Sequence, residues 1–505
     1  MKITFLVQWI PISLLVISSC KQSNPVILTD TQQTYINEVE RNLPKWLEDY
    51  GVPGAALVVI ENGHTIYQKG IGFANLESKE KVSNQTGFNI GSISKVFTAW
   101  GIMNLVEEGK IHLDDPAEKY LSRWKFPKSA FSSDDVTIRR LLSHTAGLSL
   151  HGYVGYQLGD ELPSLEESLS GVTNGSGDVR IISQPGKTLK YSGGGYTVLQ
   201  LVIEEVSGMN FSDYMEHQIL DPLGMTNSGF ILEDELLEHS SNEHNLFQES
   251  IPLEIFTAKA AAGMHTTIND FTKFILASLN NDSISLNTQS VLRPATIDSM
   301  VTPQLETNGN FGLGYGFDIV QESNDTFPAH AGGNFGWHAF FSIDRESYDG
   351  FAMLTNGDGG KYLHRKVYCD WLKRKLNISE RKGCEAAQLI PELIKELKQS
   401  GLEAAINLYL KKEQYESDIY RFNHGLLNGF GITLIWDKRY KEAIEFLKLN
   451  IERYPESWIA YNSLARAYMK NGNGSLAIEN YEKSIELNPN NENGRKMILK
   501  LKSAQ

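Results

Sequence analysis

The sequence has few cysteines and no surplus of positive charge. Only three of its 505 residues are cysteine, too few for a disulfide-rich scaffold or for a zinc site built from cysteine thiolates. Lysine and arginine number 47 against 61 aspartate and glutamate residues, which gives a formal net charge of -14. Binding to nucleic acid requires cations that neutralise phosphates. The composition therefore argues against a nucleic-acid partner.

The length and overall composition are those of a globular protein with more than one domain. Hydrophobic residues make up 41% and charged residues 21% of the chain, within the usual range for globular proteins. A chain of 505 residues is too long to fold around one ordinary core, so we expect two or three domains.

The N-terminal segment has the pattern of an export signal. Lys2 is followed by an apolar run over residues 3–17, two serines and Cys20. Such a run fits the core of a signal peptide and is short for a membrane span. Its end resembles a bacterial lipoprotein signal, which implies a signal peptide over 1–19 and acylation of the Cys20 sulfur. An ordinary secretory signal and an uncleaved anchor are the alternatives.

Export would place the protein in the periplasm or the cell envelope, attached to a membrane by its lipid. Residues 21–25, after the acylated cysteine, are expected to form a flexible tether. In an oxidising compartment Cys369 and Cys384 could pair. The sequence leaves a disulfide and two free buried thiols equally open.

A Ser-x-x-Lys spacing, Ser92 to Lys95, stands directly before a long apolar run that predicts a helix. Side chains three positions apart meet on one face of a helix. A lysine whose pKa is lowered by burial could take the proton of the serine hydroxyl and make it a nucleophile. The spacing alone is not specific, because the chain contains it four more times. The other pairs are Ser18/Lys21, Ser78/Lys81, Ser122/Lys125 and Ser379/Lys382.

Two later stretches contain side chains suited to chemistry. Residues 137–148 predict a short helix and a turn, in which we expect His144 to pin a loop through backbone hydrogen bonds rather than to act as a base. Residues 151–180 indicate a surface excursion that could form one wall of a cleft. Tyr191 then precedes three glycines and an apolar helix, and a phenol presented into a cleft and a packed aromatic remain equally open. The glycines lack the lysine of a phosphate-binding loop and indicate close backbone approach instead.

Strand patterns stand at both ends of this region. Two β-branched runs around an Asn-Gly turn over residues 54–67 predict a β-hairpin. Residues 330–343 predict one strand with His330 at its head and small residues at its start, and residues 350–355 predict another. Small residues would let a substrate approach the strand.

Histidines and glutamates gather in one polar stretch, as Glu238, His239, Glu243 and His244. Because the stretch has no pattern that would orient these side chains, we expect a solvated loop. No metal and no cofactor are assigned.

The C-terminal part of the chain, residues 385–505, is helical in character and rich in lysine and glutamate. A period of 34 residues relates Pro455 to Pro489, and the small and bulky positions between them resemble tetratricopeptide repeats. Two units are expected over 424–491, with a degenerate one before them. Helix pairs of this kind bury their faces against their neighbours. A surface that binds a protein partner and a packing element that caps the first domain remain equally open.

Together and in this order, the motifs resemble the serine β-lactamase and penicillin-binding protein superfamily, in particular the class C β-lactamases and related D-peptidases and esterases. The matching elements are Gly91-Ser92-Ile93-Ser94-Lys95, Leu141 to Leu148, Tyr191-Ser192-Gly193 and His330-Ala331-Gly332. The resemblance covers residues 32–375. It implies an α/β (α+β) domain of the β-lactamase/transpeptidase-like kind, with an antiparallel sheet flanked by helices and a helical lobe beside it. The repeats would form an all-α domain.

The resemblance also implies roles for individual residues. Ser92 corresponds to the acylated nucleophile, while Lys95 and Tyr191 share the work of general base and proton shuttle. The backbone N–H groups of Ser92 and Gly333 would form an oxyanion hole. Which of the lysine and the tyrosine takes the first proton is left open.

Two positions depart from the family pattern. Gly193 replaces an asparagine that hydrogen-bonds the substrate amide, and His330 replaces a permanently charged lysine. With Gly332 and Gly333, these residues would line the substrate. A site without both groups is less suited to a β-lactam carboxylate and to fast deacylation. We therefore expect a peptidase, amidase or esterase acting on a small molecule or peptide, more than a true β-lactamase. The alternative is a non-catalytic sensor or scaffold that binds a muropeptide-like ligand and, through its repeats, a protein.

Overall fold

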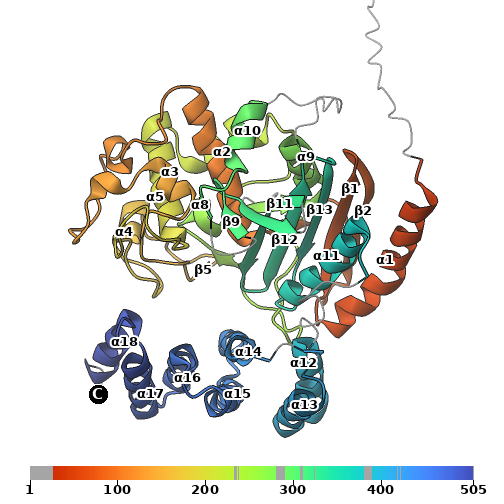
Figure 1. Cartoon of the computed structure of the whole chain (residues 1–505), viewed down its shortest axis with the longest axis vertical. Helices are drawn as coiled ribbons and strands as arrows, with labels where there is room; N and C mark the ends of the chain where they lie inside the picture. The colour runs from red at the N-terminus through yellow and green to blue at the C-terminus, as the bar shows by residue number, and fades with distance from the viewer. Residues whose placement is uncertain are drawn as a thin grey trace, which may run out of the picture.

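The computed structural model describes residues 27–503, except 232–235, 237, 280–290, 307–310, 323–324, 380–388, 418 and 421. Figure 1 shows a larger domain built around a sheet and, below it, a row of helices that ends at the C-terminus. Cys20, Cys384 and the predicted signal peptide lie outside the described residues. Cys369 is disulfide-bonded, so it is not a free thiol. Within the described ranges no helix is long and apolar enough to cross a membrane.

The centre of the larger domain is an antiparallel sheet of nine strands, in the order β3-β2-β1-β13-β12-β11-β10-β9-β8. The strands are β1 Gly54–Glu61, β2 His64–Asn75, β3 Glu80–Lys81, β8 Leu305–Glu306, β9 Phe311–Leu313, β10 Asp318–Glu322, β11 Asp325–Asn334, β12 Trp337–Asp344 and β13 Asp349–Thr355. Two short pairs lie apart from it, β4 Gly87–Asn89 with β7 His265–Thr267 and β5 Tyr156–Gln157 with β6 Glu254–Ile255. Strands from the two ends of the domain meet in the middle, where β1 pairs with β13.

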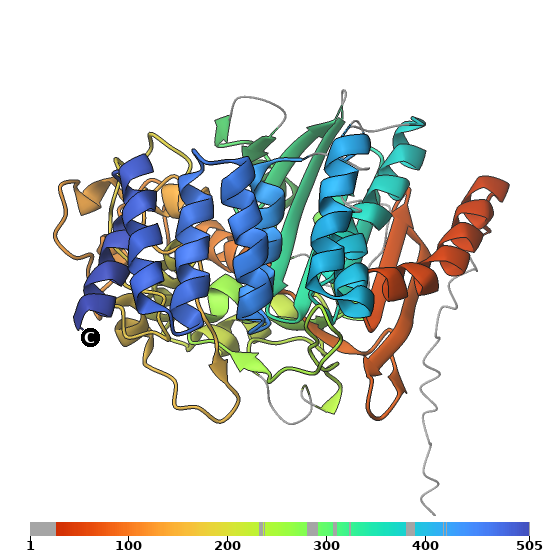
Figure 2. The same ribbon diagram turned by 90° about the horizontal axis from the view of Figure 1, so that it is seen from below.

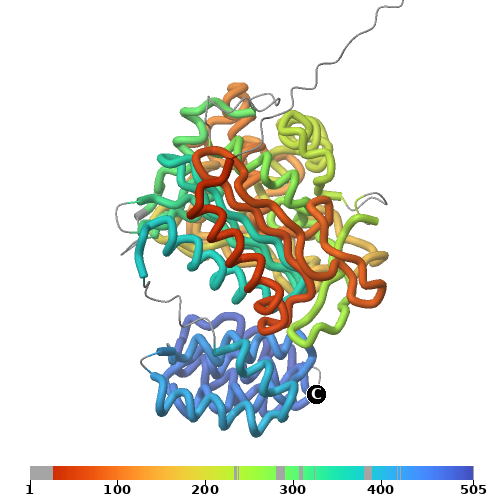
Figure 3. The backbone as a smooth tube through the Cα atoms, turned by 90° about the vertical axis from the view of Figure 1, so that its right-hand side faces the viewer, coloured from red at the N-terminus to blue at the C-terminus, as the bar shows by residue number. Residues whose placement is uncertain are grey.

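The central strand β1 is buried on both faces, because successive side chains of a strand point to opposite sides. Ala56, Val58 and Ile60 face one core, and Ala55, Leu57 and Val59 face another. Helices α2 Ser94–Glu107 and α9 Ile268–Leu279 cover the first core. Helices α1 Asp30–Asp49 and α11 Gly360–Leu376 cover the second, on the side facing the viewer in Figure 3.

The hairpin predicted over 54–67 is confirmed. Strands β1 and β2 join at Asn62 and Gly63, which both have a positive φ, 50° and 75°. A two-residue turn with positive φ at both positions matches the twist of the strands it connects.

The single strand predicted over 330–343 is wrong, because the chain turns back at residues 335–336 and forms β11 and β12. Gly336 has a φ of 76°, and its N–H donates to Asp358 Oδ1 at 2.8 Å. The turn therefore depends on a carboxylate that follows 22 residues later. As a result His330 lies inside β11 rather than at the head of a strand.

A helical lobe lies beside the sheet, on the left in Figure 1. Its helices are α3 Ile138–Leu142, α4 Leu165–Leu169, α5 Gly193–Ser207, α6 Phe211–Met215, α8 Lys259–Ala262 and α10 Pro294–Met300. The three glycines after Tyr191 form the first turn of α5 and do not precede it as a loop. Ser192 caps this helix by accepting a hydrogen bond from the Gly195 N–H at 3.0 Å.

The C-terminal domain is a row of antiparallel helices, seen side by side in Figure 2. They are α12 Leu389–Ser400, α13 Leu402–Tyr415, α14 His424–Trp436, α15 Tyr440–Arg453, α16 Trp458–Lys470, α17 Gly474–Leu487 and α18 Glu492–Ser503. Small residues stand where helices pack most closely. A Cβ added to Gly431 in α14 would come within 2.6 Å of the Leu447 side chain in α15.

The repeats pack against the larger domain. Leu246 of the larger domain is fully buried in the core of the repeats. Lys361 Nζ donates to Thr433 Oγ1 at 2.7 Å, and the Arg439 guanidinium lies 3.4 Å from the ring centre of Phe247. Part of the repeat domain therefore acts as a packing element, one of the two interpretations that the sequence left open.

The solvated loop predicted around His239 and His244 is only half correct. His239 is exposed, but Glu243 and His244 are buried. A Cβ added to Gly336 would touch the Glu243 side chain at 2.5 Å. The segment passes between the β11–β12 turn and the repeats, a position that its polar composition does not indicate.

Candidate active site

Ser92 lies at a sharp corner that rests directly on β11. It belongs to one turn of 3-10 helix, Gly91–Ile93, which continues into α2. Gly91 has a φ of 49°, and a Cβ there would lie 2.5 Å from the Gly333 amide nitrogen. A Cβ on Gly332 would lie 1.9 Å from the Ile90 carbonyl oxygen. Both glycines are therefore required for this close approach of two backbones.

Two asparagines that the sequence did not single out hold this corner in place. Asn334 Nδ2 donates to Asn89 Oδ1 at 2.7 Å and to the Ala262 carbonyl at 2.9 Å. Asn89 Oδ1 also accepts the Gly91 N–H at 2.8 Å. These bonds connect β4, the end of β11 and α8 around Ser92. No spacing in the sequence indicates them, because Asn89 and Asn334 are 245 residues apart.

Lys95 lies one turn after Ser92, in direct contact with it. Its Nζ is 3.1 Å from Ser92 Oγ and donates to the Ala261 carbonyl at 2.6 Å. The side chain is only 2% exposed. Burial lowers the pKa of Lys95 to about 7, although the charge of Asp318 opposes the shift. Near neutral pH a large fraction of Lys95 is uncharged and able to accept the Ser92 proton.

Tyr191 lies beside Ser92 and is at the same time a packed aromatic, so it has features of both interpretations that the sequence left open. Burial raises the pKa of its phenol well above its ordinary value, and the neighbouring Ser92 hydroxyl opposes this shift. The ring lies at a tilt against His144, with centroids 4.2 Å apart, and against His151, with centroids 4.9 Å apart. The phenol therefore stays protonated and oriented towards the serine.

His144 pins a loop, as predicted. Its Nδ1 accepts the Ser192 N–H at 3.1 Å, and its carbonyl accepts the Lys190 N–H at 2.8 Å. Burial, followed by the nearby charge of Lys95, lowers the pKa of the imidazole well below its ordinary value. The neutral ring fixes the segment that carries Tyr191.

His330 is buried in β11 and belongs to the same group of titratable side chains. Its Nδ1 donates to the Ala331 carbonyl at 2.7 Å, which leaves Nε2 as an acceptor. Burial lowers the pKa of His330, while Asp318 opposes the shift and Lys95 adds to it. Burial in turn raises the pKa of Asp318, against the charges of His330 and Lys95. Asp318, at the start of β10, was not identified from the sequence.

Gly193 is the last of the predicted site residues and stands at the first turn of α5. Its N–H donates to the His151 carbonyl at 2.9 Å. The structure thus brings the predicted residues to one place, between the start of α2, strand β11 and the start of α5.

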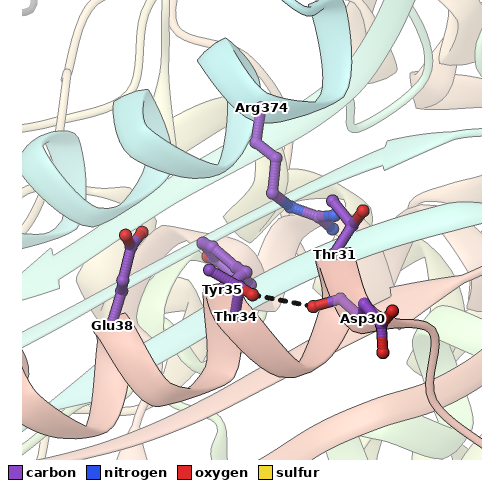
Figure 4. Close-up of a pocket in the computed structure, with 6 residues that line it drawn as sticks. All are labelled: Asp30, Thr31, Thr34, Tyr35, Glu38 and Arg374. Atoms are coloured by element: carbon purple, nitrogen blue, oxygen red, sulfur yellow. Dashed lines mark hydrogen bonds between the residues drawn. The ribbon is translucent and has the colours of Figure 1, made fainter.

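A separate hollow of about 380 Å³ lies between α1 and α11, on the other face of the sheet (Figure 4). Its lining residues are Asp30, Thr31, Thr34, Tyr35, Glu38 and Arg374. Arg374 reaches from α11 towards α1, lies 4.6 Å from the ring centre of Tyr35 and pairs with Glu61. Because α2 covers the opposite face, this hollow is not part of the Ser92 site.

Comparison with known proteins gives matches for both parts of the chain. The family model described as beta-lactamase matches residues 36–368, and the tetratricopeptide repeat model matches residues 458–491. The chain is 28% identical to Protein flp of Staphylococcus aureus over 227 residues, which cover 45% of this chain and 44% of flp. It is 32% identical over 199 residues to PbpX of Bacillus subtilis, named as a candidate penicillin-binding protein, covering 39% and 46%. The chain thus spans less than half of each of these relatives.

A solved structure supports the same assignment. The octameric penicillin-binding protein homologue from Pyrococcus abyssi has a TM-score of 0.57 and 26% sequence identity. The match covers 72% of this chain and 82% of that one. The predicted resemblance and the predicted fold class, a mixed domain with an antiparallel sheet followed by helical repeats, are confirmed.

Proposed function

Since the chain belongs to the beta-lactamase family, we propose that it is a serine hydrolase that forms an acyl-enzyme at Ser92. The contact of Lys95 Nζ with Ser92 Oγ at 3.1 Å carries the proposal, because it places a buried amine beside the hydroxyl. A pKa of about 7 for this amine suits a general base at neutral pH.

In the first half of the proposed reaction Ser92 Oγ attacks the substrate carbonyl and its proton passes to Lys95 Nζ. The negative charge that develops on the carbonyl oxygen is stabilised by the N–H groups of Ser92 and Gly333, since Gly91, the neighbour of Ser92, lies against the Gly333 amide. The bond to the leaving group then breaks. The proton reaches the leaving group from Lys95 through the Tyr191 hydroxyl, and water releases the acyl group by the reverse path.

The substrate class we propose is an amide or ester, including D-amino-acid peptides, in preference to β-lactams. Gly193 supplies no side chain to hold a substrate amide. His330, whose pKa burial lowers, is uncharged at neutral pH and offers no permanent cation for a carboxylate. Both features support peptidase or esterase activity.

A covalent probe tests the proposal directly. A fluorophosphonate should label the wild type and fail to label Ser92→Ala, because only the nucleophile reacts. Ser78→Ala is the matched control, since Ser78 has the same spacing to a lysine but lies exposed on the surface. Equal labelling of wild type and Ser92→Ala would refute the proposal. Labelling at Ser92 without turnover of any ester, amide or lactam would favour the non-catalytic scaffold instead.

We also propose that the protein is exported and acylated at Cys20, on the support of its N-terminal pattern alone. Expression in a bacterium that processes lipoproteins should place the wild type in the membrane fraction. Cys20→Ala should lose incorporation of a labelled fatty acid. Absence of the labelled fatty acid from the wild type, or equal labelling of both proteins, would contradict lipid attachment.

A further inference from the structure

The segment 149–152 is docked on the first turn of α5. Its carbonyl groups accept the N–H groups of that turn, Gly193 to His151 at 2.9 Å and Gly194 to Leu150 at 3.2 Å. The amides of a first helical turn have no partner within the helix. The bonds therefore satisfy the end of α5 and fix the segment beside Tyr191.

This docking leaves no room for a side chain at position 193. A Cβ on Gly193 would lie 2.9 Å from the His151 carbonyl oxygen and 3.4 Å from Gly152 Cα. The backbone of 151–152 thus occupies the place where the asparagine of the family pattern would project. The glycine at position 193 is therefore a consequence of the packed segment. The same segment brings a different polar side chain to the site.

That side chain is the imidazole of His151. Its ring lies against the ring of Tyr191, with centroids 4.9 Å apart and planes at 41°. Unlike His144, which is buried, His151 is exposed. Its carbonyl holds α5, while no hydrogen bond joins its ring nitrogens to the described part of the chain. The backbone of His151 is therefore fixed, and its ring lies against Tyr191 with both nitrogens available.

Partial burial and nearby positive charges favour the neutral form of the His151 ring. Burial of part of the ring and the positive charges of Lys95 and Lys190 lower its pKa. The Tyr191 phenol lies between the His151 ring and the neutral His144 ring, and these are the other titratable groups in contact here. A neutral imidazole has one donor and one acceptor, the same capability as a carboxamide.

We propose that His151 contacts the substrate and hydrogen-bonds an amide group adjacent to the bond that is cleaved. The inference rests on the serine hydrolase function proposed above and narrows its substrates to acyl groups that carry such an amide, as a peptide does. The imidazole takes the part that an asparagine at 193 would play, from a neighbouring segment.

Two variants separate hydrogen bonding from packing. His151→Phe keeps an aromatic ring against Tyr191 and removes both nitrogens, whereas His151→Gln keeps a donor and an acceptor. Each is assayed on the para-nitrophenyl ester of N-acetyl-D-alanine and on para-nitrophenyl propionate, which has the same acyl chain without the amide. Fluorophosphonate labelling of Ser92 reports whether the nucleophile remains intact.

We expect His151→Phe to lower kcat/KM about tenfold on the amide-bearing ester, the loss typical of one hydrogen bond. On the propionate it should change less than about twofold, and His151→Gln should keep the ratio of the activities on the two esters close to that of the wild type. Wild-type activity of His151→Phe, equal losses on the two esters, equal losses in the two variants or a loss of Ser92 labelling would each overturn the inference. Absence of Ser92-dependent labelling in the wild type would instead refute the serine hydrolase function.

Discussion

Burial of the Lys95 amine has two consequences. An amine buried among apolar side chains is costly in its charged form, so the fold lowers its affinity for protons. The same effect produces a base that is available near neutral pH. Its two hydrogen-bonding partners, Ser92 Oγ and the Ala261 carbonyl, direct the nitrogen at the serine. Burial of this one residue therefore accounts for most of the predicted chemistry.

The pH dependence of acylation follows from this lysine. Activity on a neutral ester should rise as the pH increases through about 7 and level off above it, because the uncharged form of Lys95 accepts the proton. Lys95→Met should lose this rise and lower kcat/KM by about 10² to 10⁴. Steady-state kinetics between pH 5 and 9 provide the measurement. A wild-type profile that is flat between pH 6 and 8 would contradict the assignment.

At the scale of elements, the site depends on the contact between the Gly91 corner and strand β11. Neither element forms the site alone, since the proposed oxyanion hole takes one amide from each. Position 91 needs both a positive φ and the absence of a side chain. The turn between β11 and β12 is equally specific, because the Gly336 N–H is held by Asp358.

Gly91→Ala should show the cost of the close contact with β11 separately from the general cost of a positive φ. The added methyl group would meet the Gly333 nitrogen, so we expect about 1–3 kcal/mol of destabilisation together with loss of Ser92 labelling. Gly109→Ala is the control, because Gly109 also has a positive φ, 72°, but nothing lies within 4 Å of an added Cβ. It should lose stability and keep its labelling. Normal labelling of Gly91→Ala would contradict the close contact.

At the scale of the whole molecule, the two domains share part of their apolar cores. Leu246 belongs to the larger domain and is buried in the core of the repeats. Two polar contacts flank this region, Lys361 with Thr433 and Arg439 with Glu249. A third, between Arg180 and Glu492, joins α18 to the segment after α4. The repeats therefore stabilise the larger domain.

Leu246→Ala should weaken this attachment. We expect a loss of about 2–5 kcal/mol, the usual cost of removing a buried leucine side chain, measured by denaturant unfolding. Hydrogen exchange in α14 and α15 should rise, while Ser92 labelling stays normal because Leu246 does not touch the site. Leu158→Ala, at a position that is 53% exposed, is the control and should change stability by less than about 0.5 kcal/mol. Equal stability of the two variants would contradict a shared core.

The sequence by itself determined the features that depend on neighbouring residues. The Ser92 to Lys95 spacing and the turn at Asn62 and Gly63 are local patterns, whose physical causes lie within one or two turns of chain. The period of the repeats can likewise be read directly from the sequence, because adjacent repeats follow each other in the chain. The order of the motifs was enough to assign the family. The single strand predicted over 330–343 failed for the complementary reason, since its turn is fixed by Asp358.

Only the tertiary structure decided what the site contains beyond these motifs. Asn89 and Asn334 meet although they are distant in the chain, and Asp318 comes close to His330 because β10 lies beside β11. The asparagine missing at 193 is explained by the backbone of His151, which packs where its side chain would project. Such contacts arise from close packing of segments far apart in sequence, where no local pattern records them.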